Sequence, residues 1–320
     1  MNPFDFIVAN AKYIWGTEFS GLRFGSFRDT LRDRDIAKTE NQTTCDLHVH
    51  PYITSLDDFL GTVRIMAKNR VNVLAITVHK PDDPKQHDYW KVKDMLSSQA
   101  SALGITGFED KGLAFSFWFQ HSPFIFVPAY ETAVHVPGIR GTLDIVALMP
   151  DEGFAENIQP SPMLDEHLTL CRSYGAITVG THPYTIHDPY GPAGFFKFRY
   201  AKPGERRRIQ RAVFPQVNTI DQVASNCAWM VHSNEQAFSD YSREQQRLPL
   251  SNSDAHSTSS WTRNEIGRAA NLFWLNEFRE GSELRDQFRE AIRDSDFKTF
   301  LEYTPSLQFL HGVAFSKWTK

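Results

Sequence analysis

Two pairs of side chains in this sequence have the types and the spacing of metal ligands. His48 and His50 form the first pair, and Asp254 and His256 form the second. Residues i and i+2 of an extended chain point to the same side, so each pair can reach one ion together. Asp46 lies on the same side as the first pair and is a candidate catalytic carboxylate. Imidazole combined with carboxylate suits Zn, Mn or Fe better than Ca or Mg.

Five short apolar runs end in these pairs or in further residues of the same kind. Such runs predict buried parallel strands, and metal-type residues at their ends predict an α/β barrel with its site at the carboxyl ends of the strands. A glutamate at one end could bridge two ions, and paired ions can activate water for an in-line displacement at phosphorus. The runs span residues 44–50, 71–79, 124–131, 176–183 and 248–256, and the added candidate ligands are His79, Glu131 and His182.

In their order along the chain, these residues resemble the motifs of the PHP family, named for polymerase and histidinol phosphatase. The family motifs are Asp-x-His-x-His, Thr-Asp-His, Gly-x-Glu, Ala-His-Pro and Ser-Asp-Ala-His. The resemblance covers roughly residues 44–300 and implies a distorted seven-stranded TIM-like (β/α) barrel. It also implies two or three divalent ions (Zn, Mn or Fe) and hydrolysis of a phosphoester, either of a small-molecule phosphate or of a nucleotide. The matching segments here begin at Asp46, Thr77, Ala129, Thr181 and Ser253.

The resemblance also implies how the ligands would be divided among the ions. A first ion would lie at the first histidine pair, a second would share the glutamate with it, and a third would lie at the remaining histidines. In this division the first ion takes His48, His50, Glu131 and Asp254, the second takes Glu131 and His182, and the third takes His79 and His256.

Two departures from the family pattern matter for the site. Val78 stands where the family has the aspartate of Thr-Asp-His, which removes one acidic group near the site. Asp144 stands where many members have a histidine on the strand after the glutamate, and it could ligate the second ion through oxygen or weaken the site. A further ligand after the first motif is open. Asp57 or Asp58 could serve, but both equally fit the acidic first turn of a helix that starts near Ser55.

The stretch 183–215 follows the fourth run, and we expect it to cover the site as an inserted loop and helix at about 184–215. Long loops after barrel strands commonly shape active sites. Lys197 and Arg199 are candidate substrate-binding residues for a phosphate, and His187 is a candidate general acid. The arginines between 206 and 211 fit a solvated helix face better. Interleaved aromatic and cationic residues would also suit single-stranded nucleic acid, but the short basic run and the negative net charge make that the second choice.

Composition agrees with one barrel domain at 44–320 and an N-terminal extension at 1–43. The chain has 320 residues, 41% hydrophobic residues and a net charge of −4, which argues against general affinity for nucleic acid or membranes. The extension is rich in aromatic residues, so we expect it to pack on the barrel rather than to be disordered. Sparse cysteines and the lack of a signal peptide or a membrane-length apolar stretch favour a cytoplasmic enzyme. The oligomeric state is open.

Two other functions fit the same residues. A nuclease, or a hydrolase acting on a non-phosphate ester or amide, would use the same hydroxide chemistry, so the ligand set does not separate it from a phosphatase. A non-catalytic binding protein with a degenerate site would explain the departures at Val78 and Asp144, although retention of the other ligand-type residues argues against it. A substrate panel tests the first alternative, and metal content tests the second.

Overall fold

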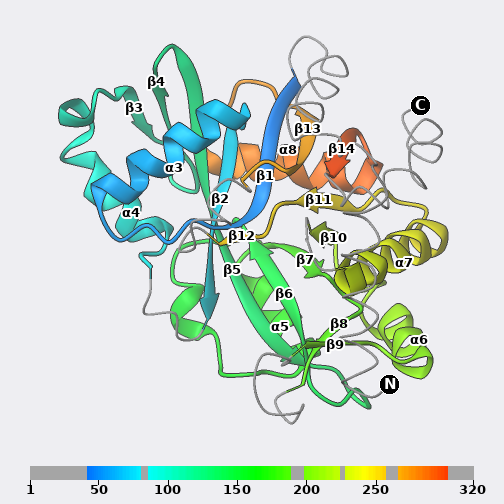
Figure 1. The fold of residues 1–320 in the computed structure, drawn as a ribbon. Coiled ribbons are helices and arrows are strands. Elements are labelled where there is room, and N and C mark those ends of the chain that lie inside the picture. The colour runs from blue at the N-terminus through cyan, green and yellow to red at the C-terminus, as the bar shows by residue number, and fades with distance from the viewer. Residues whose placement is uncertain (1–41, 81–85, 189–197, 224–227, 257–265, 302–320) are drawn as a thin grey trace.

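Our computed structural model has a mixed α/β fold, in which a sheet of parallel and antiparallel strands nearly closes into a barrel (Figure 1). The structure describes residues 42–80, 86–188, 198–223, 228–256 and 266–301. Nine strands form the main path of the sheet, in the order β11-β10-β7-β6-β5-β2-β1-β13-β14. These strands are β1 (Gln42–His50), β2 (Val73–Lys80), β5 (Ser122–His135), β6 (Thr142–Leu148), β7 (Ile177–Thr181), β10 (Thr219–Val223), β11 (Leu250–Asn252), β13 (Ala269–Trp274) and β14 (Phe297–Leu301).

The five predicted runs lie on strands that share one direction. β1, β2 and β5 pair in parallel, and β7, β10 and β11 pair in parallel. β6 runs antiparallel to both β5 and β7, so the two parallel groups point the same way. The short strand β12 (Ala255–His256) extends the fifth run and pairs in parallel with β1. The prediction of a barrel-like α/β sheet with candidate ligands at one end is confirmed, while β6, β13 and β14 depart from a purely parallel barrel.

Side-chain amides link β11 to β13, two strands that form no backbone ladder with each other. Asn271 on β13 accepts from the backbone N–H of Ser251 at 2.9 Å and donates to the Ser251 carbonyl at 2.9 Å. The Asn271 amide also donates to the side chain of Asn252 at 3.0 Å, and Asn252 accepts from the backbone N–H of Leu47 at 2.7 Å. Because these groups are buried, the amides replace hydrogen bonds that a closed sheet would otherwise supply.

Helices cover the outside of the sheet and bury apolar stripes against it. In α3 (Leu56–Asn69) the buried residues Phe59, Val63 and Met66 recur at helical spacing, and Ser55 caps the first turn. The helix that the sequence predicts to start near Ser55 is confirmed as α3. The helices are α3, α4 (Tyr89–Ser97), α5 (Leu164–Ser173), α6 (Pro203–Ala212), α7 (Ala228–Gln245) and α8 (Gly281–Asp294), with short 3-10 turns η1 (Ala100–Leu103) and η2 (Ala155–Asn157).

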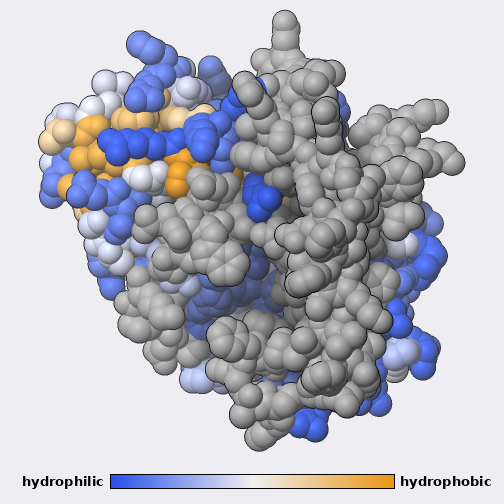
Figure 2. Space-filling model, in the orientation of Figure 1, coloured by the Kyte–Doolittle hydropathy of each residue, from blue (hydrophilic) through white to orange (hydrophobic). Residues whose placement is uncertain are grey.

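Two additions extend the barrel sheet. The stretch before the third run forms an antiparallel hairpin, β3 (Thr106–Asp110) and β4 (Phe115–Phe119), which continues onto β5. The predicted insertion forms β8 (Thr185–His187), β9 (Phe198–Tyr200) and α6. On the face shown in Figure 2, hydrophobic residues gather over α3 and α4, and the described surface at the centre is hydrophilic. Within the described residues, no helix has the length and apolar character needed to cross a membrane.

The predicted N-terminal extension falls almost wholly outside the described residues. β1 begins at Gln42, so the barrel starts two residues before the predicted boundary at 44, and the packing of residues 1–41 lies outside the described part of the chain.

Candidate metal centre

The predicted ligands come together at the carboxyl ends of the parallel strands. Within the described residues, three groups of side chains have donor atoms that all lie within 4.8 Å of one another. β1 and β2 supply His48, His50 and His79, β5 and β6 supply Glu131 and Asp144, and Asp254 lies between β11 and β12. The three groups are His48 with His50 and Asp254, Glu131 with Asp144 and His182, and His50 with His79 and His256. All eight side chains predicted as ligands therefore belong to at least one group.

The first group has the spacing that one ion requires. The Nε2 atom of His48 lies 3.2 Å from Nε2 of His50, 3.4 Å from Oε1 of Glu131 and 3.5 Å from Oδ1 of Asp254. His50 Nε2 lies 3.5 Å from the same Asp254 oxygen. Ligand atoms on bonds of about 2.1 Å stand roughly 3.0–3.5 Å apart around one ion. The donor atoms and their separations therefore fit a divalent ion at the position implied by the resemblance.

Glu131 connects this group to the other two. Its Oε1 atom lies 3.4 Å from His48 Nε2 and 3.9 Å from His182 Nε2. Its Oε2 atom lies 3.2 Å from His50 Nε2 and 3.0 Å from His79 Nε2. The Thr181 hydroxyl lies 3.1 Å from both Oε1 and the Asp144 carbonyl, so its one proton is available to Oε1 as a hydrogen bond that holds the carboxylate. The two oxygens thus face different ligands, as a bridging carboxylate requires.

Glu131 lies inside its strand, which corrects one expectation. The third run was expected to end at Glu131, but β5 continues to His135 and forms a hairpin with β6. Because β6 runs back, its beginning lies at the same edge as the ends of the parallel strands. Asp144, the third residue of β6, therefore has its Oδ2 atom 3.9 Å from His182 Nε2. The structure places Asp144 with the second group of candidate ligands.

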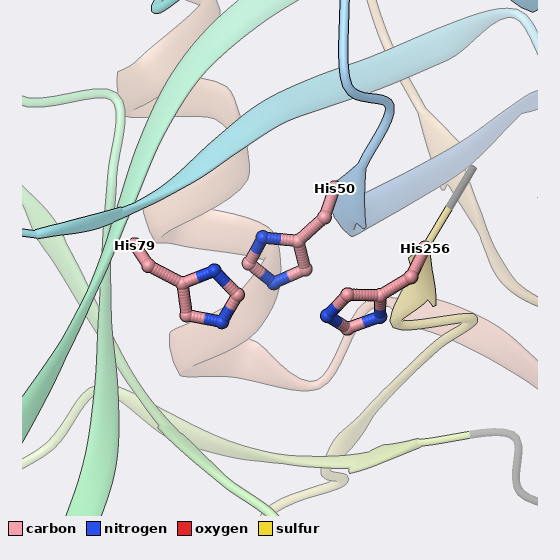
Figure 3. Close-up of side chains that lie close together, drawn as sticks. All are labelled: His50, His79 and His256. Atoms are coloured by element: carbon pink, nitrogen blue, oxygen red, sulfur yellow. The ribbon is translucent and has the colours of Figure 1, made fainter. Parts of the chain in front are cut away.

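The third group consists of three stacked imidazoles (Figure 3). The His50 ring lies between the rings of His79 and His256, with centroid separations of 4.0 Å and 4.5 Å. His79 and His256 are 45% and 36% exposed, while His50 is fully buried. His79 and His256 therefore form the most open side of the centre, and each of the other two groups contains one partly exposed carboxylate.

Two of the candidate ligand residues adopt backbone conformations that are unusual for residues with side chains. His182 has φ = 30° and Asp254 has φ = 49°. Such conformations cost of order 1–3 kcal/mol each and persist where the surrounding structure holds them. The N–H of His182 donates to the Asp221 carbonyl at 3.1 Å, and the N–H of Asp254 donates to the His48 carbonyl at 2.9 Å. These bonds aim both side chains at the centre.

Burial and mutual charge shift the pKa values of His48, His50 and Glu131 in different directions. Burial alone would lower the pKa of His48, but Asp254 and Glu131 outweigh it and hold that pKa well above its usual value. Burial alone would raise the pKa of Glu131, but His48 in particular holds it well below the ordinary range. Burial lowers the pKa of His50 to about 3. Neutral His50 and ionised Glu131 are the forms that bind metal ions.

The second group contains a carboxyl that is costly to ionise without a cation. Burial, together with the charge of Glu131, raises the pKa of Asp144 to about 6. In the neighbouring third group, the pKa of His79 rises to about 9, because the charge of Glu131 outweighs the effect of burial. A divalent ion between Asp144 and Glu131 would relieve the repulsion of the two carboxylates. The charge distribution thus agrees with the donor spacing.

Asp46, predicted as a catalytic carboxylate, is buried and binds backbone N–H groups near the candidate ligand Asp254. Its carboxylate accepts from the backbone N–H of Ser253 at 3.0 Å and from that of Gly267 at 2.8 Å. Burial raises its pKa to about 7, and the bond from Ser253 opposes that rise. Within the described residues, none of the three ligand groups includes Asp46. The carboxylate therefore fixes the segment that carries Asp254 rather than the ions themselves.

Of the two candidate substrate-binding residues, Arg199 is bonded to other groups of the protein, and Lys197 lies outside the described residues. Arg199 donates to both oxygens of Glu205 at 2.7 and 2.8 Å, to Asp188 at 3.2 Å and to the Arg140 carbonyl at 2.6 Å. These bonds use donors that a phosphate would need, so they favour a structural role for Arg199. Lys197 lies outside the described residues.

His187 is half-buried on β8, where it pairs with Thr142, two residues from Asp144. Among the described side chains, the three ligand groups do not include it. Arg207, Arg208 and Arg211 are exposed on α6, as the solvated helix face predicts, whereas Arg206 is half-buried and donates to the Tyr200 hydroxyl at 3.2 Å. The described part of the insertion thus lies beside the centre and supplies no member of the ligand groups.

Val78, a departure within the second motif, and Asp58, an open candidate after the first motif, both have local explanations. Val78 is 2% exposed and packs in the core cluster that contains Phe59 of α3, because neighbouring strand residues face opposite sides and His79 takes the side of the ligands. Asp58 accepts from Ser55 and Thr54 at the start of α3, as the helix interpretation predicted. Asp57 and Asp58 are absent from the ligand groups of the described chain.

Asp221 is a functional candidate that the sequence did not reveal. It lies on β10, is fully buried, and its Oδ2 atom is 3.1 Å from Nδ1 of His48. The signal was weak, because β10 is a five-residue strand without an extended apolar run.

A scan against protein-family models gave no match to this sequence, and a search of curated proteins gave none either. The function is therefore inferred from the residues of the centre and their geometry.

Proposed function

We propose that this chain is a metal-dependent hydrolase that cleaves phosphoester bonds and is related to the PHP family, with a distorted seven-stranded barrel as its scaffold. The observation that supports this most strongly is the separation of 3.2–3.5 Å among the donor atoms of His48, His50 and Asp254, with one Glu131 oxygen 3.4 Å from His48 and the other 3.2 Å from His50. The ordered motifs and the position of Asp144 beside His182 agree with it.

The side chains divide the work of the proposed reaction. Divalent ions held by the three groups would supply Lewis acidity, which activates water and neutralises phosphoryl oxygens. Glu131 faces ligands of all three groups and would hold neighbouring ions at a fixed separation. Asp46 holds the segment of Asp254 in place, and Thr181 holds Glu131. The exposed rings of His79 and His256 lie where a phosphoester would enter.

His187 remains our candidate for protonation of the leaving group. It lies on β8 across from Thr142, close along the sheet to Asp144, and is half-buried. A half-buried imidazole beside an active centre can give a proton to a departing alkoxide. The variant His187→Ala should slow hydrolysis of an alkyl phosphate more than that of an activated aryl phosphate. Equal rates for the variant and the wild type on the alkyl phosphate would remove His187 from this role.

The experiment that tests the proposal measures metal content and phosphatase activity on the same protein. Protein purified without chelators is analysed by mass spectrometry and assayed with a generic aryl phosphate. The double variant His48→Ala/Asp254→Ala should lose both metal and activity. The variant His121→Ala is the matched control, because His121 is an exposed residue of the turn between β4 and β5.

The outcomes separate the proposed function from its alternatives. Two or three ions per chain, lost with activity in the double variant alone, support a phosphoesterase. Metal without activity on any phosphomonoester or diester contradicts the proposal and favours hydrolysis of a different bond by the same centre. A wild-type chain that neither copurifies with nor takes up Zn, Mn or Fe favours a degenerate binding protein.

A further inference from the structure

Asp221 lies behind the candidate ligand His48 and is not itself part of the proposed ligand set. It lies on β10, between β7 and β11 in the sheet, where it pairs in register with Thr181 and Leu250. Both Asp221 and His48 are buried, with exposed fractions of 0% and 1%. A carboxylate removed from water persists only with a partner, and the partner that the structure gives its Oδ2 atom is Nδ1 of His48, at 3.1 Å.

The other nitrogen of the same ring faces the candidate ligands. His48 Nε2 lies within 3.5 Å of donor atoms of His50, Glu131 and Asp254. An imidazole binds a cation through a nitrogen that carries no proton, so the ring proton must then sit on Nδ1. That proton points at the Asp221 carboxylate, which accepts it as a hydrogen bond.

A second contact ties Asp221 to the second group. Its backbone carbonyl accepts the N–H of His182 at 3.1 Å, and His182 has the unusual backbone angle φ = 30°. One residue of β10 thus orients a ligand of the first group through its side chain and a ligand of the second group through its backbone.

We propose that Asp221 is a positioning residue that sets the tautomer and orientation of His48 and thereby the affinity of the first metal site. This assignment deepens the proposed function and rests on the metal centre, although not on the reaction that the centre performs. Partners of this kind behind metal-binding histidines typically change metal affinity 10- to 100-fold when they are replaced.

The test compares zinc binding by Asp221→Asn and by a matched control. The asparagine keeps the size of the side chain and an oxygen acceptor but removes the charge. Asp240→Asn is the control, because Asp240 is also buried, at 5% exposure, yet bonds to Tyr184 and Gln210 away from the centre. Competition with a fluorescent zinc chelator gives the affinity, and mass spectrometry gives the number of ions.

We expect Asp221→Asn to bind the same number of zinc ions with a dissociation constant for the first site about 10- to 100-fold higher. Asp240→Asn should retain the wild-type affinity. An unchanged affinity in Asp221→Asn overturns the assignment. Complete loss of one ion from a folded variant also overturns it, because Asp221 would then be a ligand itself.

A second measurement on the wild-type protein covers the case in which the variant fails to fold. Long-range proton–nitrogen NMR on zinc-loaded protein with labelled histidines should show His48 protonated at Nδ1 and bound through Nε2. Zinc on Nδ1 would overturn the assignment. A wild-type chain that binds no zinc refutes both this assignment and the proposed function, whereas zinc binding without phosphatase activity refutes only the proposed function.

Discussion

His167 on α5 makes the stability of this protein depend on pH through a single buried ring. It is 1% exposed and packs edge-on against Phe154, with ring centroids 6.2 Å apart. Within the described structure, neither ring nitrogen has a hydrogen-bond partner. Burial lowers its pKa to about 4, because the charged ring would have no partner in the core.

The sign and size of the effect follow from this pKa. In the unfolded chain His167 has a pKa near 6.5, so between pH 6.5 and 4 the unfolded state holds a proton that the folded state lacks. Stability therefore falls as the pH falls through this range. At about 1.36 kcal/mol per unit, the loss is about 2 kcal/mol at pH 5 and about 3 kcal/mol near pH 4. Above pH 7 the ring is neutral in both states and contributes no pH dependence.

The variant His167→Leu isolates this contribution. Urea unfolding of both proteins in the presence of a chelator should show a gap in unfolding free energy that moves by about 2 kcal/mol between pH 7.5 and pH 5, in favour of the variant. The packing change contributes equally at both values and cancels. The exposed His121→Leu should show no such movement. A gap that stays constant, or that moves in favour of the wild type, would refute the assignment of a neutral buried ring.

Four further predictions concern the centre and the barrel. Glu131→Gln should bind at least one ion fewer and hydrolyse an aryl phosphate about 100- to 1,000-fold more slowly, as measured by mass spectrometry and a phosphatase assay. Asn271→Leu should lose about 2–4 kcal/mol of unfolding free energy in urea, whereas the exposed Asn276→Leu should not, because buried Ser251 groups lose their partners. Asp58→Ala should lose about 1 kcal/mol with unchanged metal content; loss of an ion would restore its role as a ligand. Asp144→His should raise the ratio of Zn to Mn taken up from an equal mixture several-fold, and an unchanged ratio would exclude Asp144 from the second group.

The parts of the centre that sequence could predict depend on local geometry. The two-residue spacing of His48 and His50 places both on one side of any extended strand, and an apolar run before them predicts that strand. The structure places both side chains in one ligand group on β1. The helix start at Ser55 was predictable for the same reason, because a cap bonds within its own first turn.

The antiparallel direction of β6 could have been predicted from the sequence, but we did not predict it. Only residues 136–141 connect β5 to β6, whereas a parallel crossover needs about a dozen residues or more. Gly138 and Gly141, both with positive φ, fit the turns of a short hairpin connection. The short connection therefore indicates an antiparallel strand, and with it the place of Asp144 at its beginning.

Contacts between distant segments could not be read from the sequence. His48 and Asp221 are 173 residues apart, and nothing in the short strand around Asp221 indicates which strand lies opposite its side chain.

The contact between Arg199 and Glu205 is local, since the two residues are six positions apart, and their bidentate pair forms because β9 leads directly into α6. The sequence therefore suggested that Arg199 binds substrate, whereas in the fold Arg199 binds the carboxylate of Glu205.

The carboxylate of Asp144 bears on which ion the second group would prefer. With Glu131, Asp144 and His182, this group offers two oxygen donors and one nitrogen donor. The first group offers two imidazoles and a carboxylate from Asp254. Oxygen-rich sites suit Mn, whereas imidazole also suits Zn, so a histidine at position 144 would have made the two groups chemically alike. The aspartate instead makes the second group harder and more negative, and a centre with unlike sites is the arrangement that would bind two different metals.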